Sequence, residues 1–104
     1  MSITIVRWTF EGPYPLGETW RLQDRSGVYV ILDLHPDGYY CLDVGESAQV
    51  KTRVETHDRT DCWRRHRGGA LYVAVLYTPN LQQPGRSAIE QEIRRQYNPP
   101  CGER

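Results

Sequence analysis

Two apolar segments of the chain have the composition of β-strands. Residues 27–34, GVYVILDL, are rich in β-branched side chains, and residues 70–77, ALYVAVLY, are apolar almost throughout. β-Branched and aromatic residues favour strands, and a run without polar alternation is typical of a strand that is buried on both faces. The pattern predicts two strands, of which the second is central in its sheet.

The first 26 residues contain one further strand pattern. Residues 3–10, ITIVRWTF, alternate between apolar and polar side chains and are bounded by Gly12 and Pro13. Residues 11–25 contain several glycines and prolines and are predicted to form a loop, with one short extended piece around residues 20–22.

A hairpin is expected to join GVYVILDL to a return strand at residues 39–44, YYCLDV. Pro36 followed by Asp37 suits a type I turn, and Gly38 suits the left-handed bulge position after such a turn. The expected loop therefore has three residues, 36–38.

The length of this loop decides which side chains share a face of the hairpin. With three loop residues, Tyr29 opposes Gly45 and Ile31 opposes Asp43, so Tyr29 and Asp43 become diagonal neighbours on one face. A two-residue loop would place them on opposite faces, because a shift of one residue inverts the pattern. The other face is predicted to be core and carries Val28, Val30, Leu32, Leu42 and Val44.

Helical patterns follow the hairpin. Residues 48–58 are predicted to form a helix with Ser47 as its N-cap, residues 61–66 a short second helix, and residues 86–97 the last helix. Residues 98–100, Asn-Pro-Pro, should end the last helix. The expected buried positions are Val50 and Val54 on the first helix and Ile89, Ile93 and Tyr97 on the last.

These elements predict one domain over residues 1–104, of the α+β class: a small, mainly antiparallel sheet with a β-hairpin, flanked by two or three helices. The balance of 38% hydrophobic and 25% charged residues is that of a chain that folds. No apolar run approaches about 20 residues, so we expect no membrane span. The N-terminus lacks the pattern of a signal peptide, and we expect a cytoplasmic protein.

Cysteine content and net charge further limit the expected redox state and the expected partners. An odd, sparse set of three cysteines is a poor disulfide framework, so we expect reduced thiols. The net charge of zero argues against strong non-specific affinity for DNA, which needs many phosphate contacts.

Five residues could form a site for metal-assisted hydrolysis of a phosphodiester. Arg53 and His57 are four residues apart and would be neighbours on one helical face, and Glu90 flanks the apolar stripe of the last helix. With Tyr29 and Asp43 they supply a hydroxyl, an imidazole, a guanidinium and two carboxylates. A carboxylate can hold a divalent cation, a base can activate water, and an arginine can neutralise the phosphate.

The order and spacing of these residues resemble the GIY-YIG nuclease superfamily. GVY at 27–29 looks like the first half of its signature, and residues 43–45, Asp-Val-Gly, occupy the second half. Arg53 with His57, and Glu90 followed by Asn-Pro, are similar to its later motifs. The resemblance covers about residues 27–99 and leaves residues 1–26 as an additional strand and loop.

The resemblance implies an endonuclease with a single divalent cation. By analogy, Tyr29 would be the general base or orient the water, Arg53 would stabilise the phosphate, and His57 would assist. Glu90 would bind Mg²⁺ or Mn²⁺. The substrate would be nucleic acid, in the first place DNA.

Two residues depart from the family pattern. Asp43 replaces the second signature tyrosine, and Glu46 follows the glycine where a small or basic residue is more familiar. Both place negative charge where a phosphate should approach. Either Asp43 joins Glu90 at the metal or acts as a base, or it only hydrogen-bonds Arg53 or nearby backbone and catalysis is lost or left to Tyr29.

A basic cluster surrounds Trp63. It consists of Arg59, Arg64, Arg65, His66 and Arg67. We interpret the arginines as a phosphate-binding patch with an aromatic side chain available for stacking. The alternative is a solvated turn.

Cys62 and His66 lie four residues apart on the short second helix, and His57 and Cys101 are further possible zinc ligands. The spacing fits no standard zinc finger. The sequence therefore favours the alternative of a buried Cys62 that packs near Trp63.

Two functions of different classes remain. The first is a divalent-metal-dependent endonuclease, and the second is a catalytically inactive module on the same scaffold that binds nucleic acid or protein. A third possibility is a homodimer, or a subunit that needs a partner to act on two strands.

Overall fold

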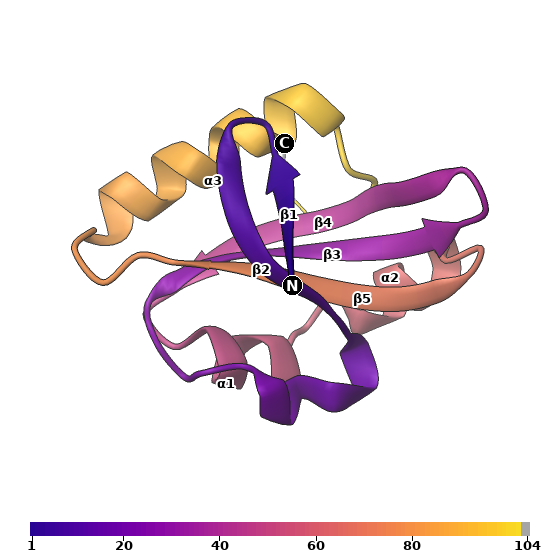
Figure 1. Ribbon diagram of the computed structural model, residues 1–104, viewed down its shortest axis with the longest axis horizontal. Helices are drawn as coiled ribbons and strands as arrows, with labels where there is room; N and C mark the ends of the chain where they lie inside the picture. The colour runs from indigo at the N-terminus through magenta and orange to yellow at the C-terminus, as the bar shows by residue number, and fades with distance from the viewer. Residues whose placement is uncertain (103–104) are drawn as a thin grey trace.

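Five antiparallel strands form one sheet in the computed structural model, which describes residues 1–102 (Figure 1). The order across the sheet is β1-β2-β5-β3-β4, so the strand predicted to be central is central. In chain order the strands are β1 (Ser2–Ile5), β2 (Trp8–Pro15), β3 (Gly27–His35), β4 (Gly38–Ser47) and β5 (Ala70–Tyr77).

Helices cover both faces of the sheet. They are the 3₁₀ helix η1 (Leu16–Arg21), α1 (Val50–Glu55), α2 (Thr60–His66) and α3 (Gln83–Tyr97). Figure 1 shows η1, α1 and α2 on one side of the sheet and α3 on the other. The arrangement confirms the predicted α+β class with its antiparallel sheet and hairpin.

The buried apolar residues form two clusters, which the strands β3 and β5 separate. One cluster joins Tyr29, Ile31 and Val73 to Val50 and Val54 of α1 and Trp63 of α2. The other joins Val28, Val30, Val44 and Ala74 to Ile93 of α3 and to Ile5 and Phe10 of the first two strands. Alternate residues of β3 enter opposite clusters, as the two-residue period of a strand requires.

The prediction of one strand over residues 3–10 is wrong, because the chain turns back at Val6 and Arg7. Val6 has a positive φ of 58°, and β1 and β2 pair with Ile5 opposite Trp8. The turn contains no glycine, proline or asparagine, so the sequence carries no turn signal there. Strand β2 then continues to Pro15, with a register shift between Glu11 and Tyr14, through residues that were predicted to be loop.

The β3–β4 hairpin has the expected register around Tyr29, but not the expected turn. Tyr29 lies opposite Gly45 and Ile31 lies opposite Asp43, as predicted. The turn has two residues rather than three, because His35 pairs with Gly38, whose φ is 135°.

A β-bulge at Leu42 corrects the parity that the short turn would have inverted. Ile31 pairs with Asp43 and the next residue, Leu32, pairs with Cys41, so Leu42 is the extra residue. Leu42 consequently packs in the cluster of Tyr29 and not on the opposite face, contrary to the prediction. The bulge, and not Gly38, brings Tyr29 and Asp43 to one face.

Helix boundaries differ from the predictions at their N-terminal ends. Helix α1 begins at Val50, and Ser47 accepts the N–H of Gln49 without capping the helix. Helix α3 begins at Gln83, three residues early, because a proline in the first turn lacks only an N–H that would have no partner. The helix ends at Asn98 with a left-handed conformation, and Tyr97 is 47% exposed rather than buried.

The prediction of reduced thiols is wrong for two of the three cysteines. Cys62 of α2 and Cys101 form a disulfide across 39 residues of chain, and Cys41 is free. Odd cysteine counts argue against a disulfide framework, but they do not exclude a single bridge.

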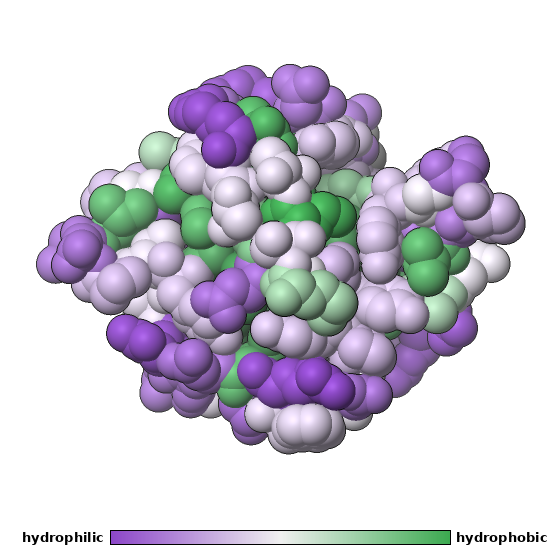
Figure 2. All heavy atoms as spheres, in the orientation of Figure 1, coloured by the Kyte–Doolittle hydropathy of each residue, from purple (hydrophilic) through white to green (hydrophobic). Residues whose placement is uncertain are grey.

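Two further properties concern the surface. On the face seen in Figure 2, hydrophobic residues reach the surface in several separate patches with hydrophilic residues between them. Within residues 1–102, no helix combines the length and the apolar character needed to cross a membrane.

Candidate functional site

Tyr29 and His57 form a buried hydrogen-bonded pair at one end of the hairpin. The Tyr29 hydroxyl lies 2.7 Å from Nε2 of His57, and both side chains are almost fully buried. Tyr29 crosses β4 directly over Gly45, where a Cβ atom would overlap the hydroxyl group. Glycine is therefore required at position 45 for the tyrosine to reach the histidine.

The hydrogen bonds of His57 show which ring nitrogen carries the proton. Nδ1 accepts the backbone N–H of Arg59 at 3.0 Å. A neutral ring then carries its proton on Nε2 and donates it to Tyr29. Burial, together with the charges of Arg53 and Arg59, lowers the pKa of His57 to about 4.

Burial also changes the acidity of Tyr29. It raises the pKa of the hydroxyl to about 12, although the nearby charge of Arg53 opposes this rise. At neutral pH the pair therefore consists of a neutral phenol and a neutral imidazole. A phenol with this pKa is a poor general base, which is the role that the resemblance implied for Tyr29.

Arg53 lies beside this pair, but not by the helical spacing that was predicted. Helix α1 ends at Glu55 and Thr56 is its C-cap, so His57 lies outside the helix. Arg53 instead donates to Asp58, which follows His57, at 3.2 Å. The structure thus brings Arg53 and His57 together through the turn after α1.

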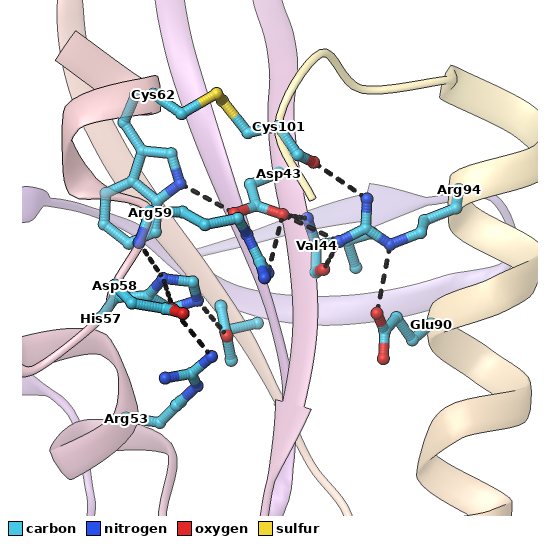
Figure 3. Close-up of polar contacts among 12 residues, drawn as sticks. Asp43, Val44, Arg53, His57, Asp58, Arg59, Cys62, Glu90, Arg94 and Cys101 are labelled. Carbon is cyan, nitrogen blue, oxygen red and sulfur yellow. Dashed lines mark hydrogen bonds and ion pairs between the residues drawn. A yellow bond between two sulfur atoms is a disulfide. The ribbon is translucent and has the colours of Figure 1, made fainter. Parts of the chain in front are cut away.

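Asp43 has no exposed surface, and every acceptor position of its carboxylate is used (Figure 3). Oδ2 accepts from Nε of Arg59 and from Nε1 of Trp63, both at 2.8 Å. Oδ1 accepts from the backbone N–H of Val44 at 2.8 Å, from Arg94 at 2.9 Å and from Arg59 at 3.2 Å. No oxygen remains for a metal ion.

The partners of Asp43 agree only in part with those that the sequence suggested. The predicted bond to a nearby backbone group is present, from the Val44 N–H, but the predicted partner Arg53 is replaced by Arg59, Arg94 and Trp63. Trp63 is 1% exposed, so it is not available for stacking on a base, contrary to the prediction. Arg59 is held by Asp43 and is therefore not a free phosphate ligand.

Arg94 is the residue of this site that the sequence did not reveal. Its buried guanidinium donates to Asp43, to the carbonyl oxygens of Val44 and Cys101, and to Glu90. Its position one helical turn after Glu90 was a partial signal, but its contact with Asp43 depends on the packing of α3 against β4.

Glu90 and Asp43 do not form a shared metal site. Its Oε2 accepts from Nε of Arg94 at 3.1 Å, and its side chain is largely buried. In Figure 3, Arg53, His57 and Asp58 lie to one side of Asp43, and Glu90 lies to the other beside α3. Within residues 1–102, the other oxygen of Glu90 has no hydrogen-bond partner, so Glu90 could offer at most one ligand to a cation.

The remaining arginines of the predicted patch form an exposed group, which we call the α2 arginine cluster: Arg64, Arg65 and Arg67. Arg64 pairs with Asp61 at 3.3 Å, and Arg67 donates to the backbone carbonyl of Gly69. Within the described residues, Arg65 forms no ion pair. The cluster therefore presents positive charge to solvent at the end of α2.

Comparisons with protein-family models, with curated proteins and with solved structures found no match to this chain. The resemblance to the GIY-YIG superfamily therefore rests on the sequence motifs quoted above.

Proposed function

We propose that this protein binds the phosphodiester backbone of nucleic acid through the α2 arginine cluster, and that Asp43 serves the fold rather than catalysis. The exposure of the α2 arginine cluster carries the first part of this proposal, and the saturated carboxylate of Asp43 carries the second. Asp43 is the residue that departs from the nuclease pattern, and in the structure its carboxylate binds Arg59 and Arg94.

The distribution of charge supports a binding surface on this part of the chain. Residues 50–69 contain six Lys and Arg against three Asp and Glu, whereas the rest of the chain contains seven against ten. Exposed arginines bind phosphates through charge and through paired N–H donors. A neutral protein with one basic region should bind nucleic acid weakly and with a strong dependence on salt.

The proposal can be tested by fluorescence anisotropy with a labelled DNA duplex and the same sequence as a single strand. We expect the Arg65→Ala/Arg67→Ala double variant to bind more weakly than wild type. Its slope of log affinity against log salt should decrease by about 0.9 for each duplex phosphate that the variant no longer neutralises.

The matched control is the double variant Arg21→Ala/Arg25→Ala, which removes the same charge from exposed positions elsewhere. If both double variants weaken binding equally, net charge and not the α2 arginine cluster is responsible. If wild type binds neither probe even at low salt, the proposal fails.

The second candidate is metal-dependent hydrolysis, the function that the resemblance implies. Arg53 beside the Tyr29–His57 pair supports it, but the second carboxylate oxygen of Glu90, the expected metal ligand, lies on the other side of Asp43. Asp43 does not fit as a metal ligand, so a cation would have Glu90 as its only carboxylate ligand among the residues of the predicted site. Plasmid nicking in Mg²⁺ or Mn²⁺ that Glu90→Gln abolishes and Arg65→Ala leaves intact would favour this candidate.

A further inference from the structure

A second group of metal-ligating side chains lies on α2 and in the segment after α3. Cys62 and His66 are four residues apart and share one side of the helix. Cys101, which follows α3, reaches the same place through its disulfide with Cys62, with the two Cα atoms 5.9 Å apart. The two sulfur atoms and a ring nitrogen of His66 all lie within 4.8 Å of one another.

We propose that reduction of this disulfide creates a zinc site formed by Cys62, His66 and Cys101. Two thiolates and one imidazole are ligands that Zn²⁺ prefers, and Zn²⁺ binds them in tetrahedral geometry. Three protein ligands leave the fourth position to water or to an anion. The site is not a zinc finger, because the fold brings Cys101 from a distant part of the chain, so the unusual ligand spacing does not argue against it.

Of the three histidines, which all lie within residues 1–102, His66 is the one that is free to become a ligand. His57 is buried and uses both ring nitrogens, and His35 pairs with Asp33 at 2.8 Å. His66 is exposed, and among the described residues it has no hydrogen-bond or ion-pair partner. Its ring can therefore turn toward the two sulfurs without breaking another interaction.

The chemistry requires a reductant followed by the metal. A dithiol transfers two electrons and two protons to the disulfide, which yields the two cysteine thiols and the oxidised dithiol. Zn²⁺ then binds the two sulfurs as thiolates, and the two thiol protons are released to solvent. The cross-link between α2 and Cys101 is thereby replaced by a metal bridge between the same residues.

This bridge matters for the anchor at Asp43, because Cys101 is part of its surroundings. The Cys101 N–H donates to the carbonyl of Leu42 at 3.0 Å, and the Cys101 carbonyl accepts from Arg94 at 3.0 Å. The disulfide and the zinc bridge therefore both hold Cys101 where its carbonyl orients Arg94 toward Asp43. The reduced, metal-free protein loses this restraint.

The test uses Co²⁺ as a spectroscopic probe for the zinc site. Wild-type protein is reduced with a phosphine, which supplies no thiol to compete for the metal, and is titrated anaerobically with Co²⁺. We expect one Co²⁺ per chain, a thiolate-to-cobalt charge-transfer band and the strong visible absorption of tetrahedral cobalt. Zn²⁺ should remove both signals, and the oxidised protein should show neither.

His66→Ala is the informative variant, because it leaves both cysteines in place and changes an exposed residue. We expect its affinity for Co²⁺ to fall more than roughly tenfold, because losing a hydrogen-bond partner of a ligand already costs about 10–100-fold and losing the ligand should cost more. Cys41→Ser is the matched control and should bind as wild type does. The circular dichroism of the oxidised variants should match that of wild type.

Two results would overturn the proposal. The first is the absence of a charge-transfer band in reduced wild type whose far-ultraviolet circular dichroism is native. The second is equal affinity and equal spectra for wild type and His66→Ala. Neither result bears on DNA binding by the α2 arginine cluster, so the two proposals can fail separately.

Discussion

The β3–β4 hairpin contains two buried aspartates whose charges are balanced in different ways. Asp33 lies near the turn and is 1% exposed. It accepts the backbone N–H groups of Gly68 and Gly69, at 2.7 and 2.9 Å, and pairs with His35 at 2.8 Å. Asp43 lies in the middle of the hairpin, opposite Ile31, and is held by two arginines, a tryptophan and one backbone N–H.

The two carboxylates differ in which parts of the fold they join. Asp33 fixes the short loop before β5, and neutral backbone donors supply most of its bonds. Asp43 joins Arg59, at the start of α2, to Arg94 of α3, and these helices cover opposite faces of the sheet. Removal of Asp33 leaves polar groups without their acceptor. Removal of Asp43 takes the carboxylate from two arginines, of which Arg94 keeps Glu90.

Asp43→Ala should therefore produce the largest loss of stability. Breaking a buried ion pair from one side costs about 3–5 kcal/mol, because the remaining charge stays buried without a partner. The free energy of unfolding can be measured by urea denaturation at neutral pH. Asp61→Ala, at an exposed position, is the control and should change stability by less than about 0.5 kcal/mol. A smaller loss for Asp43→Ala than for Asp33→Ala would contradict the comparison.

His57, which lies near Asp43, should be a source of stability that is lost in mild acid. The pKa of His57 is about 4 in the folded protein and 6.5 for a free histidine, so the unfolded chain binds more protons between these pH values. The contribution is complete above pH 6.5 and decreases as the pH falls toward 4, by about 3 kcal/mol in total. His57→Gln should flatten the dependence of unfolding free energy on pH in this window, and an unchanged profile would contradict it.

Strands and helices with long apolar patterns could be predicted from the sequence, whereas the connections that build the site could not. The register that joins Tyr29 to Asp43 was predicted correctly for the wrong reason, since a bulge at Leu42 has no local sequence signal comparable to that of Gly38. The chain reversal at Val6 also lacks turn residues. Arg94 became visible as a site residue only when the fold placed α3 against β4.

Asp33→Ala should destabilise the protein less than Asp43→Ala. It leaves the N–H groups of Gly68 and Gly69 without their acceptor, and an unpaired buried polar group costs about 1–3 kcal/mol. Amide hydrogen exchange should show the loss locally, with faster exchange at these two glycines. Asp33→Asn keeps one acceptor oxygen and should lie between alanine and wild type.

The free energy of unfolding measured as a function of pH tests the contribution of Asp33. Burial alone would raise the pKa of Asp33, but hydrogen bonds from Gly68, His35 and Gly69 outweigh it and hold the pKa below its ordinary value. Asp33 therefore adds stability above the ordinary pKa of an aspartate, and this stability is lost as the pH falls through the lower folded value. The acid limb of Asp33→Asn should be shallower than that of wild type; equal limbs would show that Asp33 contributes nothing there.

Tyr29→Phe should have the smallest effect of these changes, at the lower end of about 1–3 kcal/mol, because it leaves one buried donor without an acceptor in a site that keeps its packing. The His57 Nε2–H loses its acceptor while Nδ1 keeps the Arg59 N–H. If the protein acts by binding through the α2 arginine cluster, Tyr29→Phe should bind the DNA probes with wild-type affinity. If it is a nuclease that uses the Tyr29 hydroxyl, the same variant should lose plasmid nicking while its unfolding free energy changes little. Stability and activity measured on this one variant therefore separate a tyrosine that packs the hairpin from one that performs chemistry.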